Sequence, residues 1–322
     1  MDVRALRPLG RTRLMTTPIG LGLAAVGRPA YITLGRAEDL GADRSVDAMR
    51  ARAWAVLDAA WEAGVRYFDA ARSYGLAEEF LAGWLHERGI APGAATIGSK
   101  WGYAYVGGWR MDADDHEVKE LSAGRLRRQI EETRALLGEH LSLYQIHSAT
   151  VESGVFDDED VLARLYALRA EGVAVGFSTT GPRQAETIDR AVASGVFDMV
   201  QSTWNLLERS AEEALARAYD AGLGVIVKEG VANGRLTARA APPALAEAAR
   251  ERDVTPDALA LAAVLSRPWA GVVLSGAVSA PQLRSNLTAA DISWDRDLDD
   301  RLAVLAEEPE TYWRTRAALA WH

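Results

Sequence analysis

The sequence alternates short apolar runs with stretches of helical periodicity, and this alternation limits its possible folds more than any other feature. Unbroken apolar runs of this length are typical of parallel strands that are buried on both faces. The apolar runs lie at residues 18–22, 65–69, 95–99, 143–146, 173–177, 199–200, 224–227 and 271–274. The helical patterns lie at residues 47–63, 76–88, 121–137, 161–170, 185–193, 211–221 and 259–265. Eight strands that alternate with helices predict a closed (β/α)₈ TIM barrel, with residues 1–322 as a single domain.

The segment before the first apolar run predicts an N-terminal β-hairpin. The pieces LRPLG and RLMTT are β-like and are joined by the turn-forming Gly10-Arg11-Thr12. A doubly wound sheet is the second possible fold, but no G-x-G-x-x-G follows any apolar run. Residues 23 to about 43 form a polar, glycine-rich connection that is too long for a simple link, so we expect it to cover something.

Composition excludes several classes of function. A formal charge of −9 without any Lys/Arg-rich run argues against partners such as nucleic acid or an anionic membrane surface. No cysteine is present, which excludes disulfides, thiolate metal sites and thiol nucleophiles. The histidines share no metal-ligand spacing, so no metal is expected. No apolar stretch approaches a membrane-spanning length, which predicts a soluble cytoplasmic protein.

Polar residues follow the apolar runs, where each predicted strand ends. All strands of a barrel end on the same rim, so these residues are expected to converge although they are far apart in sequence. They are Asp69, Lys100, His147, Ser178, Gln201 and Lys228. Only three lysines occur in the chain, and two of them stand at predicted strand ends. Considered without the other residues, Asp69 is also compatible with a residue that caps the following helix.

The converging residues indicate carbonyl chemistry. A buried carboxylate at Asp69 requires a cationic partner, and Lys100 is the natural one. Tyr74, a few residues past the same strand, can lie beside Lys100, and a neighbouring ammonium is expected to lower the pKa of a phenol from about 10. Such a tyrosine can donate its proton to a developing alkoxide, while His147 orients the carbonyl. None of these side chains can supply a hydride, so a nicotinamide cofactor is implied.

Several motifs together resemble the aldo-keto reductases, in the right order from about residue 9 to residue 286. The motifs are Phe68-Asp69-Ala70-Ala71-x-x-Tyr74-Gly75, Ser99-Lys100, Tyr144-Gln145-Ile146-His147, Gly176-Phe177-Ser178, Gln201-Ser202-Thr203-Trp204-Asn205-Leu206-Leu207-Glu208-Arg209 and Ser275-Gly276-Ala277-x-x-x-x-Gln282-Leu283-x-x-Asn286. The resemblance implies Tyr74 as proton donor, tuned by Lys100 and Asp69, with His147 as the orienting group. It also implies that Ser178 and Gln201 hold the nicotinamide carboxamide, that Trp204 stacks on the nicotinamide ring, and that Asn286 contacts the adenine.

The sequence departs from the family pattern at the expected cofactor site. The resemblance implies a Lys or Arg near Gly276, Val278 or Gln282 to bind the 2′-phosphate of NADP, and all three positions are neutral here. With Arg284 as a substitute, NADP is favoured over NAD. Lys228-Glu229-Gly230 stands in place of a common Tyr-Ser-Pro run. Lys228 is therefore expected either to hold a cofactor phosphate or to be a salt-bridged loop residue.

Two aromatic segments are candidates for the walls of a substrate site. Residues 101–119 contain Trp101, Tyr103, Tyr105 and Trp109 directly after Lys100. The C-terminal Tyr312, Trp313 and Trp321 are expected to form a second wall or a helix packed on the barrel. Together they favour an apolar or aromatic carbonyl compound, or the corresponding alcohol, as the small-molecule partner.

The sequence therefore predicts an NAD(P)H-dependent aldo-keto reductase, and two alternatives remain open. One is a lyase of the aldolase type, in which Lys100 or Lys228 forms a Schiff base with the substrate. The other is a module that binds a nicotinamide cofactor on the same barrel without catalysing a reaction.

Overall fold

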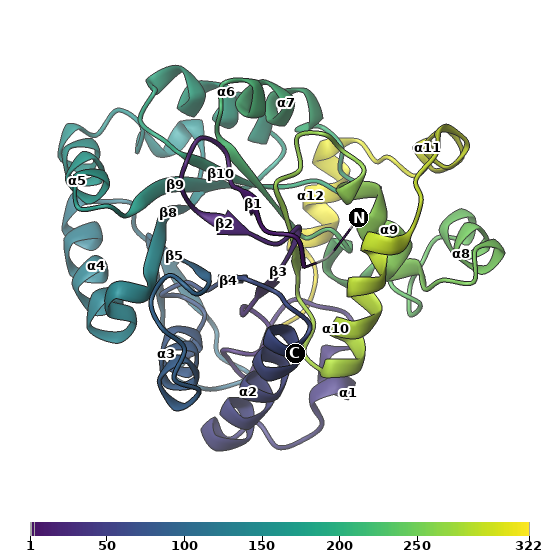
Figure 1. The fold of residues 1–322 in the computed structure, drawn as a ribbon, viewed down its shortest axis with the longest axis horizontal. Helices are drawn as coiled ribbons and strands as arrows, with labels where there is room; N and C mark the ends of the chain where they lie inside the picture. Colours follow the sequence, from purple (N-terminus) through teal and green to yellow (C-terminus); the bar gives the residue numbers. More distant parts are fainter. Residues whose placement is uncertain (1, 3, 322) are drawn as a thin grey trace.

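A closed barrel of eight parallel strands forms the centre of the protein, in a computed structural model that describes residue 2 and residues 4–321 (Figure 1). The strands follow the order β10-β11-β12-β3-β4-β5-β8-β9 around the barrel. They are β3 (Ile19–Gly22), β4 (Tyr67–Asp69), β5 (Thr96–Trp101), β8 (Leu141–Ala149), β9 (Ala174–Thr179), β10 (Met199–Thr203), β11 (Gly224–Lys228) and β12 (Val272–Ser275). The predicted (β/α)₈ barrel is confirmed.

Helices surround the barrel, and most of them connect one strand to the next (Figure 1). The connecting helices are α2 (Val46–Glu62), α3 (Ala77–Glu87), α4 (Ala123–Leu137), α5 (Glu159–Ala170), α6 (Gln184–Ser194), α7 (Glu212–Asp220) and α9 (Pro256–Leu265). Helix α10 (Ala280–Leu287) follows the last barrel strand. The sequence patterns did not mark α10 or three more helices, α1 (Arg36–Leu40), α8 (Pro243–Glu251) and α11 (Arg296–Ala303). The last helix, α12 (Pro309–Ala317), buries Tyr312 and Trp313, for which a helix packed on the barrel was one of the two expectations.

The apolar periodicity of the sequence explains how a helix packs on the barrel. In α2 the buried side chains are Met49, Ala53, Val56, Leu57 and Ala60, which recur at intervals of three and four residues. The Ser45 hydroxyl caps this helix by accepting a hydrogen bond from the Ala48 amide. All three residues of strand β4 are buried, as expected for a strand covered on both faces.

The N-terminal hairpin is present and closes the barrel at the end where the strands begin. Strands β1 (Arg7–Pro8) and β2 (Met15–Thr16) pair antiparallel, as the sequence predicts, and Figure 1 shows them lying across the barrel. Between them, Leu9 is buried against Tyr67, Leu143 and Met199. Gly10 has φ of 59°, and a Cβ there would lie 2.2 Å from the Gly224 amide nitrogen. Only glycine fits this turn without displacing the start of β11.

Three segments extend the barrel beyond the carboxyl ends of its strands. The connection after β3 contains α1, and the connection after β5 contains a second hairpin of β6 (Tyr103–Tyr105) and β7 (Glu117–Lys119). The C-terminal segment contains α11 and α12. Among the helices of the described residues, none combines the length and the apolar character that crossing a membrane requires.

Candidate active site

A cavity of about 690 Å³ opens at the end of the barrel where the strands finish. This is the end at which (β/α)₈ barrels carry their functional residues. Of the residues expected from the sequence to form the site, seven line the cavity: Asp69, Tyr74, His147, Gln201, Lys228, Gly276 and Asn286. Lys100, Ser178, Trp204 and Arg284 are not among the residues that line it.

A buried ion pair joins Lys100 and Asp69 at the ends of neighbouring strands. The Lys100 ammonium donates to Asp69 Oδ2 and, at 3.0 Å, to the carbonyl oxygen of Ala70. Asp69 Oδ1 accepts hydrogen bonds from Gln201 Nε2 at 3.0 Å and from the Tyr67 hydroxyl at 3.2 Å. The Lys100 and Asp69 side chains are 0% and 2% exposed, so each charge depends on the other for compensation.

Tyr74 lies beside this pair. The Lys100 nitrogen is 4.9 Å from the centre of the Tyr74 ring. The pKa of Tyr74 is nevertheless raised well above its usual value, first by burial and then by the negative charge of Asp69. The expected lowering by Lys100 is therefore wrong, because burial of the phenol outweighs the neighbouring charges. The phenol keeps its proton at physiological pH and is available as a donor.

His147 faces Tyr74 across the same part of the cavity. Their ring centres are 5.4 Å apart with an interplanar angle of 84°, and His147 Nδ1 lies 3.4 Å from the Ser73 hydroxyl. Burial lowers the pKa of His147 well below its usual value, and the nearby cations Lys100 and Arg28 lower it further. The imidazole is therefore neutral and can donate one hydrogen bond to a carbonyl oxygen.

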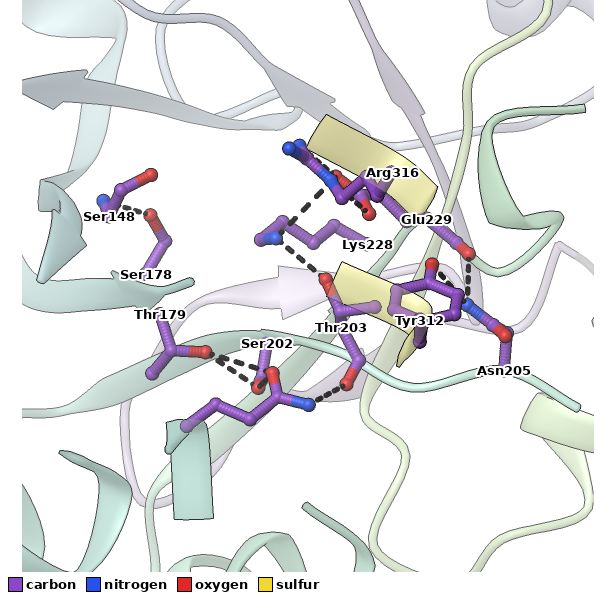
Figure 2. A network of polar contacts seen from close by, with 11 residues as sticks. Ser148, Ser178, Thr179, Ser202, Thr203, Asn205, Lys228, Glu229, Tyr312 and Arg316 are labelled. Atoms are coloured by element: carbon purple, nitrogen blue, oxygen red, sulfur yellow. Dashed lines mark hydrogen bonds and ion pairs between the residues drawn. The ribbon is translucent and has the colours of Figure 1, made fainter. Parts of the chain in front are cut away.

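A second charged cluster lines the cavity at the end of β11 (Figure 2). The Lys228 ammonium donates to the Thr203 hydroxyl at 2.7 Å and lies 3.7 Å from Glu229. Arg316 of α12 binds both carboxylate oxygens of Glu229 through its Nε, each at 2.9 Å. Burial lowers the pKa of Lys228 to about 8. Burial alone would raise the pKa of Glu229, but Arg316 and Lys228 outweigh it and lower this pKa to about 2.

Three expected cofactor residues do not line the cavity, and two of them, Trp204 and Arg284, lie away from it. Trp204 is fully buried and packs edge-on against Trp269 with ring centres 5.7 Å apart, while the Arg267 guanidinium lies 4.8 Å from its ring. The Trp204 ring belongs to the core and does not line the cavity, so its position gives no support to the predicted stacking on a nicotinamide. Arg284 is exposed on α10 and does not line the cavity, so its position gives no support to the predicted contact with a cofactor phosphate.

The remaining cofactor candidates are held by hydrogen bonds. Ser178 is buried, and its hydroxyl accepts a hydrogen bond from the amide of Ser148 at 2.8 Å (Figure 2), so it supports Ser148, which lines the cavity. Asn286 accepts from the Ser275 hydroxyl at 2.7 Å and donates to Asp257 at 2.7 Å. At Gly276, an added Cβ would meet no atom within 4 Å, so the backbone there borders open space.

The predicted aromatic walls are present only in part. Tyr103 and Trp321 line the cavity, whereas Trp101, Tyr312 and Trp313 are buried. Within the described chain, no group of His, Cys, Asp or Glu side chains is arranged to hold a metal ion.

Sequence reasoning missed several charged residues of the cavity. Arg28 is 2% exposed, packs over the Tyr74 ring at 5.2 Å and binds Glu117 at 2.7 Å. The length of the connection after β3 was the available signal for Arg28, because a long loop next to a barrel strand commonly covers a site. No local pattern marked Glu117 or Arg316, since each acts through a partner that is distant in sequence.

Comparisons with known proteins show which family and which solved structures this chain resembles. The sequence model described as "Aldo/keto reductase family" matches residues 18–302. Oxidoreductase YqkF of Bacillus subtilis is 25% identical over 313 aligned residues, which cover 88% of this chain and 90% of YqkF. Pyridoxal 4-dehydrogenase of Microbacterium luteolum is 27% identical, with 72% of each chain covered. The solved holo form of the aldo-keto reductase AKR11C1 from Bacillus halodurans shares the fold, with a TM-score of 0.72, 21% identity, and coverage of 95% of this chain and 97% of that chain.

The family model extends over most of the barrel, from the start of β3 into α11. The chain therefore belongs to the aldo/keto reductase family.

Proposed function

We propose that this protein interconverts an aldehyde or ketone and the corresponding alcohol, with a nicotinamide cofactor as hydride carrier. One observation carries the proposal. A protonated Tyr74 and a neutral His147 face the same cavity beside the buried Lys100–Asp69 pair. A phenol and an imidazole that face one space can together hold a carbonyl oxygen and protonate it.

In the reducing direction, Tyr74 and His147 both donate hydrogen bonds to the substrate carbonyl oxygen. A nicotinamide held in the cavity would supply the hydride. As negative charge develops on the oxygen, the phenolic proton of Tyr74 moves to it and gives the alcohol. Lys100 then stabilises the phenolate until solvent returns the proton, because its ammonium lies next to the ring. Alcohol oxidation uses the same groups in reverse.

The residues around the cavity fit a nicotinamide dinucleotide. Gln201 donates through its nitrogen to Asp69, which leaves its amide oxygen as the acceptor for a carboxamide. Asn286 and Gly276 lie where β12 passes into α10, and the open space beside Gly276 allows a ligand to approach the backbone. We assign Gln201 and Asn286 to direct contacts and Ser178 to support through Ser148. Lys228 is assigned to the part of the cofactor near β11.

The choice between NADP and NAD cannot rest on Arg284. The sequence favoured NADP because that side chain offered a cation for the 2′-phosphate. Its exposed position outside the cavity removes this support.

One observation favours a Schiff-base lyase as a second candidate. Lys228 lines the cavity, and its pKa of about 8 gives a larger neutral fraction than an ordinary lysine has. Lys100 is a poor nucleophile by comparison, because its ammonium is held by Asp69 and the Ala70 carbonyl.

The test combines cofactor consumption with chemical trapping. Purified protein is assayed with NADH and with NADPH against a panel of aliphatic, aromatic and sugar aldehydes that includes pyridoxal, and with the matching alcohols and oxidised cofactors. We expect turnover that requires the cofactor and is lost in Tyr74→Phe. Borohydride treatment of cofactor-free protein should leave no substrate on Lys228. Trapped substrate together with cofactor-independent turnover would refute the proposal in favour of a lyase.

A further inference from the structure

One end of the cavity is formed by α10, by the end of β12 and by the start of α9, and we call it the α10 end. Two carboxylates line it, Asp39 from α1 and Asp257 from α9. Asp257 accepts hydrogen bonds from Asn286 at 2.7 Å and from Ser285 at 2.8 Å, and both donors are neutral. The negative charge of Asp257 is therefore met only by neutral donors, whereas that of Asp39 is paired with Arg239.

The cations near the α10 end are already engaged. Arg239 binds both oxygens of Asp39, at 2.8 and 2.6 Å, and lies 3.5 Å from Glu38. Arg36 also lines the cavity, but its guanidinium is directed at backbone, with hydrogen bonds to the carbonyl oxygens of Ala25 and Pro29 at 2.8 Å each. Among the described residues of this end, no Lys or Arg is held in place for an incoming anion.

Gln282 connects α10 to Asp39, the carboxylate that Arg239 binds. Its Oε1 accepts from the Val278 amide at 3.0 Å, which fixes the orientation of the side-chain amide. Its Nε2 then donates to Asp39 Oδ2 at 2.6 Å. Gln282 is one of the positions at which the sequence analysis expected a phosphate-binding cation. In this protein the Gln282 side chain instead binds the carboxylate of Asp39, which lines the cavity.

We propose that the α10 end selects NAD(H) over NADP(H) and that Asp39 determines this preference. The inference rests on the proposed function, which requires a nicotinamide dinucleotide. A phosphate monoester carries a charge of about −1.5 to −2 at neutral pH and needs Arg or Lys donors. At this end it meets Asp39 and Asp257, and Arg239 could reach it only by leaving Asp39. The free ribose hydroxyls of NAD(H), in contrast, can donate hydrogen bonds to a carboxylate.

The test measures binding, not turnover. Cofactor-free protein is titrated with NADH and with NADPH, and the dissociation constants are taken from quenching of tryptophan fluorescence. We expect NADH to bind at least roughly tenfold more tightly, as a like charge at close range in a partly buried site predicts. Asp39→Ser removes the carboxylate and releases Arg239, so this ratio should shift toward NADPH by a similar factor. Glu38→Ser is the matched control, because Glu38 is 77% exposed on the same helix and does not line the cavity.

Each outcome decides the inference. NADPH binding as tightly as NADH to the unchanged protein would overturn it, and so would an Asp39→Ser ratio equal to that of Glu38→Ser. Arg239→Met provides a second test, since selective loss of NADPH affinity in that variant would show that Arg239 holds the 2′-phosphate after all. If neither cofactor binds, the proposed function fails and the selectivity inference fails with it, whereas a reversed preference refutes the inference alone.

Discussion

Breaking the buried Lys100–Asp69 ion pair with one substitution should cost a large part of the protein's stability. Lys100→Met leaves the Asp69 carboxylate without a cation in a site where both side chains are at most 2% exposed. Removal of one partner from a buried pair typically costs about 3–5 kcal/mol. Asp69 keeps its hydrogen bonds from Tyr67 and Gln201, which places the expected loss near the lower value, about 3 kcal/mol.

The double variant separates charge compensation from packing. Lys100→Met combined with Asp69→Asn removes both charges, so it should recover about 2 kcal/mol or more relative to Lys100→Met alone. The matched control is Arg217→Met, which breaks an exposed pair with Asp189 and should change the free energy of unfolding little. Free energies of unfolding are measured by urea denaturation of the cofactor-free proteins at neutral pH.

The decisive quantity is the coupling free energy between the substitutions Lys100→Met and Asp69→Asn. If the double variant is less stable than Lys100→Met by the full cost of Asp69→Asn, the two charges do not compensate each other. If Lys100→Met unfolds at the same urea concentration as Arg217→Met, the pair behaves as a surface ion pair. Either result would refute the electrostatic basis of the site.

Three further predictions concern other parts of the cavity. The pKa of Glu229, about 2 against an ordinary 4.5, means that its ionisation stabilises the fold above pH 4.5 and that about 3 kcal/mol is lost as the pH falls toward 2. Acid titrations of stability should therefore be flatter in Glu229→Gln, and an unchanged acid slope would contradict the assignment. Trp204→Ala should cost about 3–5 kcal/mol in urea denaturation. Its NADH affinity should remain within about threefold, in line with a buried ring outside the cavity. Trp321 lies over the Arg28 guanidinium at 4.9 Å, so Trp321→Ala should raise KM for carbonyl substrates several-fold with little change in Tm, as steady-state kinetics and thermal unfolding would show.

The barrel was predictable because its strands are buried on both faces and read as unbroken apolar runs. Strand β4, for example, is marked by Tyr67 and Phe68 and ends at a polar residue. The hairpin around Gly10 was visible from its turn residues. Helices α1 and α8 were not separable from the long polar connections that contain them, because propensity is a weak signal in short helices.

The site was predictable where a residue stands at a strand end. Asp69, His147, Gln201 and Lys228 reach the cavity because the strand ends of a barrel share one rim. Trp204 lies in the core and not at the cavity, because an aromatic ring just past a strand end can turn either way, and the sequence does not show which.

The charges of the cavity depend on partners that no local pattern reveals. Glu229 is held by Arg316, 87 residues further along the chain. Asp39 is held by Arg239, at a separation of 200 residues. The pKa of Tyr74 was predicted in the wrong direction for the same reason, since burial outweighs the neighbouring charges once the fold is known.

The central claim is that Tyr74 donates the proton to a carbonyl oxygen in this cavity. The most direct measurement is single-turnover oxidation of bound reduced cofactor by a carbonyl substrate in Tyr74→Phe, with cofactor affinity determined on the same preparation. The account predicts unchanged cofactor binding and a rate lower by a factor on the order of 10²–10⁴. A rate within about threefold of the unchanged protein, which is far outside that range, would contradict it.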